Sequence, residues 1–142
     1  MMRVTADRGR RAGIFESSPH MQVELTNDPG AAQLARRAVA TWASDMLDVE
    51  KLSSVVLMAS ELVSNAVRFT TGQISLSVWH CERSGWRVEV TDESVLPPLV
   101  RADTGRFRGS RGYGLKIVDS LSSVWGSIAR PGGKCVWFEL RN

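Results

Sequence analysis

A chain of 142 residues with 43% hydrophobic residues is long enough for one domain with a substantial core and too short for two. No run approaches the roughly 18 consecutive apolar residues of a membrane span, and the N-terminus lacks the apolar stretch of a signal peptide, so we expect a cytoplasmic protein that does not contact membranes. The net charge is +3: residues 1–12 and residues 95–111, each with four arginines and one aspartate, contribute +3 apiece, and the remainder contributes about −3. The positive charge is therefore local, which argues against the evenly basic face of a nucleic-acid-binding domain.

The N-terminal half predicts a flexible basic arm, one strand and two helices. Residues 1–16 are rich in Arg and lack periodicity, so we expect an arm that precedes a single domain of residues 17–142. Residues 20–28 alternate as a strand does. Asp28 followed by Pro29 is typical of a helix start, and this helix is expected to continue to about Asp45. Its expected apolar side consists of Ala32, Leu34, Ala35, Val39 and Trp42. A second helix should begin near Asp48 or Glu50 and continue to Phe69.

The C-terminal half predicts two hairpins with a helix between them. Residues 73–82 and 86–93 alternate around a Ser-Gly turn. Residues 95–111 contain two prolines and no periodicity, which predicts a long loop. A helix over residues 113–123 and a hairpin turning at residues 131–133 complete the chain. The order β-α-α-β-β-loop-α-β-β predicts an α+β two-layer sandwich, with a mixed, mostly antiparallel sheet and its helices on one face. Cys81 and Cys135 lie in strand-like runs without metal-site spacing, which predicts reduced thiols.

A polar pair interrupts the apolar second helix. Glu61 and Asn65 are four residues apart and therefore share one helix face. A buried carboxylate or amide needs a partner. Three interpretations remain open here: the pair binds a hard cation such as Mg²⁺, Glu61 acts as a general base, or both side chains face solvent or cap the neighbouring hairpin.

Two further features fit a nucleotide pocket. Asp92 ends the second strand of the first hairpin, although an aspartate there also commonly forms a turn. The stretch GSRGYG at residues 109–114 precedes a helix, where glycines allow close approach and the helix start offers N–H groups to an anion; a tight turn is the alternative. The GGKC stretch at residues 132–135 opens a strand, which excludes a phosphate-binding P-loop, and residues 112–114 follow a loop, which argues against a Rossmann fingerprint.

These motifs together resemble the GHKL ATP-binding superfamily, and most of all its small anti-sigma-factor serine/threonine kinases of the actinobacterial type. SELVSNAV at residues 60–67 resembles the N box, VTDES with the following prolines the G1 box, GSRGYGLKIVDSLSSVWG the G2 box, and PGGKCVWFEL the closing G3 region. The resemblance extends over roughly residues 20–141. It implies the Bergerat-type ATP-binding fold, with ATP and Mg²⁺ as cofactors.

The resemblance also implies residue roles. Asn65 would hold Mg²⁺ and Glu61 would activate the target hydroxyl, while Asp92 would accept the adenine amino group. Residues 95–111 would form a lid over the phosphates. The other residues implied in nucleotide binding are Ser94, Arg111, Gly112, Tyr113, Gly114, Leu115, Lys116 and Cys135. Three positions depart from the family pattern: Phe69 replaces a common His, Ser94 a typical Gly, and Cys135 a hydroxyl residue near the adenine.

Two functions follow from the resemblance. One is a kinase that phosphorylates a STAS-type anti-anti-sigma antagonist and thereby controls a sigma factor. The other is a non-catalytic module that sequesters such a partner in a nucleotide-dependent way. A detached histidine-kinase catalytic domain is a weaker third option. The alternating residues 21–25 are suited to homodimer formation at the sheet edge.

Overall fold

The structure is a computed structural model that describes residues 15, 17–46, 49–70, 72–94 and 113–142. In chain order the elements are β1 (His20–Leu25), α2 (Ala31–Trp42), α3 (Val49–Phe69), β2 (Ile74–Cys81), β3 (Gly85–Asp92), α4 (Tyr113–Leu121), β4 (Val124–Arg130) and β5 (Gly133–Leu140). The predicted order of elements is confirmed. The loop expected at residues 95–111 and the arm expected at residues 1–16, apart from the buried Phe15, lie outside the described residues.

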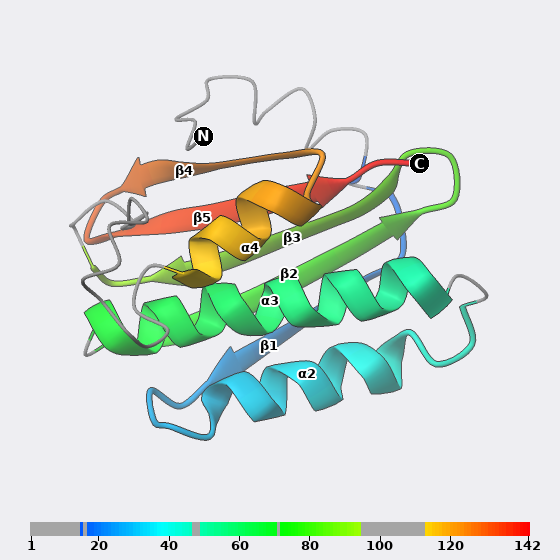
Figure 1. The fold of residues 1–142 in the computed structure, drawn as a ribbon. Helices are drawn as coiled ribbons and strands as arrows, with labels where there is room; N and C mark the ends of the chain where they lie inside the picture. The colour runs from blue at the N-terminus through cyan, green and yellow to red at the C-terminus, as the bar shows by residue number, and fades with distance from the viewer. Residues whose placement is uncertain (1–14, 16, 47–48, 71, 95–112) are drawn as a thin grey trace.

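The strands form a single five-stranded sheet, and the three helices lie together on one of its faces (Figure 1). The strand order is β1-β2-β3-β5-β4, and all four pairings are antiparallel. The two hairpins, β2–β3 and β4–β5, join through the pairing of β3 with β5. This arrangement is the α+β two-layer sandwich that the sequence predicts, with an antiparallel sheet in the described part of the chain.

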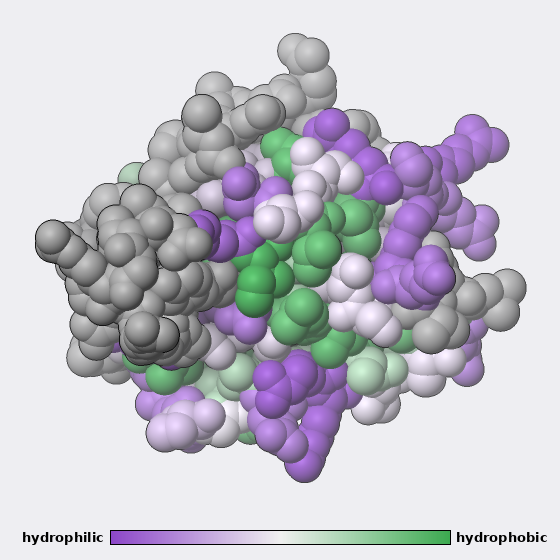
Figure 2. All heavy atoms as spheres, in the orientation of Figure 1, coloured by the Kyte–Doolittle hydropathy of each residue, from purple (hydrophilic) through white to green (hydrophobic). Residues whose placement is uncertain are grey.

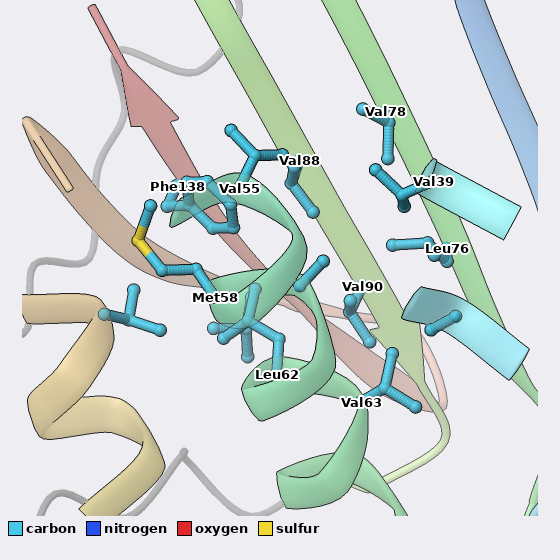
Figure 3. Packing of buried hydrophobic residues seen from close by; sticks show 14 of the residues in the cluster. Val39, Val55, Met58, Leu62, Val63, Leu76, Val78, Val88, Val90 and Phe138 are labelled. Carbon is cyan, nitrogen blue, oxygen red and sulfur yellow. The ribbon is translucent and has the colours of Figure 1, made fainter. Parts of the chain in front are cut away.

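The core lies between the sheet and α3. Buried residues of α3 recur at the spacing of one helix face, and Figure 3 shows several of them directed toward the sheet. They are Val55, Met58, Ala59, Leu62, Val63 and Ala66. From the sheet, Val88 and Val90 of β3 and Phe138 of β5 meet them. Because alternate residues of a strand point to opposite faces, Arg87 and Glu89 of β3 point away from the helices.

Helix α2 corrects one prediction. Its buried side chains are Ala31, Ala35 and Val39, spaced four residues apart, whereas Leu34 is 50% exposed. The expectation that Leu34 belongs to the core face was wrong because the small alanines at this spacing define the face that contacts the core. The helix also ends at Trp42, three residues before the expected end.

Helix α3 is the element whose length and composition need explanation. Among the described residues, its Glu50–Phe69 segment is the single stretch long and apolar enough to cross a membrane. The best 18-residue window is 44% buried inside the fold, and the helix lies between α2 and α4 above the sheet (Figure 1). The apolar composition of α3 is therefore explained by its position as the central helix of the core.

Candidate functional site

Four segments carrying the sequence motifs lie at one end of the sheet. Figure 1 shows that the C-terminal end of α3, the end of β3, the start of α4 and the turn between β4 and β5 share this end. Antiparallel pairing explains part of the arrangement, because β3 ends where its partner β5 begins. We call this region the motif end of the sheet.

Glu61 and Asn65 lie on the flank of α3 that faces α4. Figure 3 shows Met58 directed from α3 toward α4, and α3 and α4 are in contact. Residues three and seven positions after Met58 return to the same helix face. Glu61 and Asn65 occupy these positions, so the helical repeat carries the polar pair along that flank to the motif end.

Asn65 is a polar residue at a position of α3 that has little exposure to solvent. It is only 7% exposed, inside a 21-residue helix, and among the described residues neither its amide nor the half-buried Glu61 carboxylate has a hydrogen-bond partner. Asparagine also favours helices less than alanine does. A polar side chain on a largely apolar helix, with no hydrogen bond to another described residue, is available to bind a ligand. Two oxygen-bearing side chains one turn apart fit a hydrated Mg²⁺, whose remaining ligands would be water and phosphate.

Asp92 is paired with a lysine that the sequence analysis did not single out. In the β3–β5 register Asp92 lies opposite Lys134. The Lys134 Nζ atom is 3.0 Å from Oδ1 and 2.9 Å from Oδ2 of Asp92. The lysine and aspartate side chains are only 5% and 1% exposed. The Asp92 carboxylate is therefore held in a buried ion pair, on the helix-covered side of the sheet.

Gly133 allows β5 to begin this close to β3. A Cβ atom at Gly133 would lie 2.0 Å from the backbone oxygen of Asp92, which no side chain can tolerate without a shift of the backbone. Its neighbour Gly132 has a φ of 74°, and a Cβ atom there would meet nothing within 4 Å. The two glycines thus have different roles: Gly132 permits the turn, and Gly133 permits the close approach.

The remaining predicted site residues fall into three groups. Ser94 lies beside Asp92, and its backbone N–H donates to Asp92 Oδ1 over 2.8 Å. Helix α4 begins at Tyr113, so Gly114, Leu115 and Lys116 belong to its first turn, with the Leu115 side chain fully buried in the core. Arg111 and Gly112, and the side chain of Tyr113, lie outside what the structure describes.

Cys135 does not lie on the helix-covered face of the motif end. It follows Lys134 in β5 and therefore points to the opposite face of the sheet. Its Sγ atom lies 3.7 Å from Oε1 of Glu89. The β5 residue beside the Asp92 carboxylate is instead Lys134. Sequence spacing alone gave no signal for it, because the two residues are 42 positions apart.

The face of the sheet opposite α2, α3 and α4 carries its own buried charges. Arg87 donates to Glu89 over 2.9 Å and to Glu139 over 2.6 Å, and its guanidinium lies 4.4 Å from the centre of the Trp137 ring. Arg141 also contacts Glu139, over 3.3 Å. We call these residues the Arg87 cluster.

A thiol with a shifted pKa lies far from both charge clusters. Cys81 ends β2, at the opposite end of the sheet from Asp92. Backbone hydrogen bonds at Ser84 and then at Arg83 hold the pKa of the Cys81 thiol below its usual value. Cys81 lines a cavity of about 770 Å³ there, together with His80 and Asp45. Both cysteines are free, as the sequence predicts.

The outer face of the helix layer is partly apolar. Figure 2 shows hydrophobic surface across the region of α3 and α4, bordered by hydrophilic side chains. Leu57 of α3 and Leu121 of α4 are 40% and 41% exposed and contribute apolar surface to these helices.

The architecture is a helix bearing Glu61 and Asn65 over an antiparallel sheet in which strand β3 ends at Asp92. A family model described as "Histidine kinase-like ATPase domain" matches residues 25–140. The chain belongs to this family. No curated protein matches it.

A solved structure supports the same fold. The RsbU and RsbW domains of Rv1364c from Mycobacterium tuberculosis match with a TM-score of 0.64 and 20% sequence identity. The match covers 87% of this chain and 32% of that one, so the present chain spans about a third of the neighbour's length. At this identity the likeness establishes the fold.

Proposed function

We propose that the chain binds ATP with Mg²⁺ at the motif end and acts as an anti-sigma-factor-type serine/threonine kinase. The observation that carries the proposal is Asn65: a residue only 7% exposed, with no hydrogen bond from its side chain to another described residue, one helix turn from Glu61. A ligand that binds beside Asn65 would supply its side chain with a partner. Membership of the ATPase family supports ATP, carried with Mg²⁺, as that ligand.

Each residue has a distinct role in this proposal. The Asn65 side-chain oxygen ligates Mg²⁺, and Asp92 accepts a hydrogen bond from the adenine amino group. Gly112, Gly114 and the first N–H groups of α4 bind phosphate oxygens, because a helix start combines unpaired donors with the positive end of the dipole. Mg²⁺ neutralises phosphate charge when bound.

Glu61 is the proposed base for phosphoryl transfer. Its carboxylate accepts the proton of a target hydroxyl while the hydroxyl oxygen bonds to the γ-phosphorus and the bond to the ADP oxygen breaks. Positioning and charge neutralisation account for most of the rate in such reactions. The half-buried position of Glu61, on the α4-facing flank beside Asn65, suits contact with an incoming protein.

The proposed target is a serine or threonine of a STAS-type antagonist, in a cytoplasmic pathway that releases or captures a sigma factor. Phosphorylation adds about −1.5 to −2 charges to the antagonist, enough to reverse its preference for the kinase. The exposed apolar side chains of α3 and α4, such as Leu57, offer a protein-binding surface on the helix layer.

A second candidate is a nucleotide-dependent binding module without turnover. The Asp92–Lys134 pair favours it, because a base-recognition carboxylate already engaged by a lysine lowers nucleotide affinity. The two candidates share the pocket and differ only in whether phosphate leaves ATP.

Calorimetry with ATP, with and without Mg²⁺, tests the shared pocket. We expect Mg²⁺-dependent binding to the wild-type protein and at least tenfold weaker binding to Asn65→Ala. Gln22→Ala is the matched control, because Gln22 is an exposed amide of the edge strand β1 whose side chain contacts Glu24 and Ser75. Equal binding by wild type and Asn65→Ala would refute the assigned role of Asn65.

Glu61→Gln separates the kinase from the module. The variant keeps the shape of the side chain but cannot accept the proton as a carboxylate does. We expect unchanged ATP binding and loss of ³²P transfer to a STAS antagonist. Retained transfer by Glu61→Gln would rule out Glu61 as the base.

A further inference from the structure

The ion pair with Lys134 occupies the Asp92 carboxylate, the group that the proposed function assigns to recognition of the adenine. A carboxylate offers about four acceptor positions. In the structure, the Ser94 N–H occupies one position on Oδ1, and Lys134 Nζ contacts both oxygens. The aspartate side chain is 1% exposed. Three of the four positions are thus taken, and the burial shields the fourth, so a ligand amino group reaches Asp92 only after Lys134 moves.

Lys134 makes the same kind of contact that an adenine amino group would make. Both are nitrogen donors, but the ammonium is charged, and a charge-assisted hydrogen bond is about twice as strong as a neutral one. The lysine backbone also has a fixed position, because Gly133 lets β5 begin against the backbone of Asp92. The protein thus contains an internal donor for the proposed base-recognition site.

We infer that Lys134 is an internal competitor for the nucleotide base: it occupies Asp92 in the free protein and must be displaced before a 6-amino purine binds. The inference rests on the proposed function and adds to it a residue that sets nucleotide affinity and base preference. A long, flexible lysine side chain can leave the pair for solvent while its β5 backbone stays in place. The free energy needed to displace Lys134 lowers the affinity for ATP. Once Lys134 has moved, Asp92 is free to accept a hydrogen bond from the 6-amino group.

Lys134→Gln tests the inference by calorimetry at pH 8. Glutamine keeps a polar but shorter side chain and removes the charge. We expect about tenfold tighter ATP binding than in the wild type. Purine riboside triphosphate, which lacks the 6-amino group, should bind both proteins equally, because it makes no hydrogen bond to Asp92.

Lys51→Gln is the matched control for the loss of one positive charge. Lys51 lies near the start of α3, at the opposite end of the sheet, and its Nζ contacts Asn142 over 2.9 Å at the surface. We expect it to bind ATP as the wild type does. Lys134→Met is the second variant, because it removes the donor altogether and should tighten ATP binding in the same direction.

The outcomes separate the inference from the proposed function. ATP binding that is unchanged or weaker in both Lys134 variants would overturn the inference and leave the nucleotide site standing. A gain for ATP and purine riboside triphosphate alike would also overturn it, because the effect would not involve the amino group. Absence of ATP binding by the wild type and both variants would overturn the proposed function and the inference together.

A readout without nucleotide tests the pair itself. In urea unfolding, the inference requires that Lys134 and Asp92 stabilise each other in the free protein. The double variant Asp92→Asn/Lys134→Gln should lose less stability than the two single losses added together. Additive losses would show that the pair is not formed in solution and would overturn the inference.

Discussion

Two clusters of buried charge lie on opposite faces of the same strand, β3, and they differ in how their charges are paired. In the Arg87 cluster, one guanidinium contacts two carboxylates and an aromatic ring, and Arg141 adds a further contact to Glu139. At the motif end, within the described part of the chain, a single ammonium contacts a single carboxylate.

This contrast separates a structural cluster from one that is available to a ligand. The guanidinium is planar and makes several fixed contacts, so its removal takes the shortest ion-pair contact from each of two buried carboxylates, Glu89 and Glu139. Lys134 pairs through a flexible stem with Asp92 alone among the described residues, and a donor of another molecule can replace it. The Arg87 cluster stabilises the sheet, whereas in the Asp92–Lys134 pair the lysine occupies the carboxylate proposed to bind the nucleotide base.

The largest expected effect comes from Arg87→Met. Breaking a buried pair typically costs about 3–5 kcal/mol, and we expect a loss of unfolding free energy in this range by urea denaturation. Arg141→Met is the control, because Arg141 is 45% exposed and an exposed ion pair contributes about 1 kcal/mol or less. Equal losses in the two variants would remove the distinction between the cluster's central and outer arginines.

Asp92→Asn should cost slightly less, about 3 kcal/mol, because it leaves the Lys134 ammonium buried against a neutral amide. Lys134→Gln in the Asp92→Asn background should recover part of that loss, since both members are then neutral. Urea unfolding of all four proteins measures the coupling. A double variant no more stable than Asp92→Asn would contradict the view that the uncompensated charge is the source of the loss.

Gly133→Ala should cost about 2 kcal/mol, because its Cβ atom would meet the Asp92 carbonyl and force β5 away from β3. Gly132→Ala should cost about 1 kcal/mol, because the turn residue has a positive φ and open space around it. Thermal and urea unfolding compare the two. A greater loss for Gly132→Ala would mean that turn strain, and not close approach, decides the geometry beside Asp92.

The smallest effect is expected at Asn65. Alanine favours helices more than asparagine by about 0.5 kcal/mol, so Asn65→Ala should raise the unfolding free energy slightly while it weakens nucleotide binding. Circular dichroism during urea unfolding measures the change. A loss of about 1 kcal/mol or more, the usual contribution of a buried hydrogen bond, would instead assign Asn65 a structural role.

Much of the fold follows from local patterns. The alternation of residues 73–82 and 86–93 predicts the β2–β3 hairpin, and the helical spacing of apolar residues predicts α3. Local patterns were less reliable for α2, where Leu34 is exposed. Its hydrophobicity marks it as a core residue in the sequence, but the alanines four residues apart contact the core.

The candidate site divides in the same way. Glu61, Asn65 and Asp92 could be named from the sequence because each interrupts or ends a regular element with a polar group. Lys134 could not, because its importance arises from the strand across from it. Cys135 was placed beside the base by resemblance, whereas strand alternation directs its side chain to the other face of the sheet.

Residue types at short spacing in the chain are enough to predict the order of the elements, the polar pair within an apolar helix, and the family. The contacts of Asp92 are different, because they depend on which strands pair in the folded protein. Antiparallel pairing of β3 with β5 brings together residues 42 positions apart, and Gly133 brings the two backbones close enough for the ion pair to form.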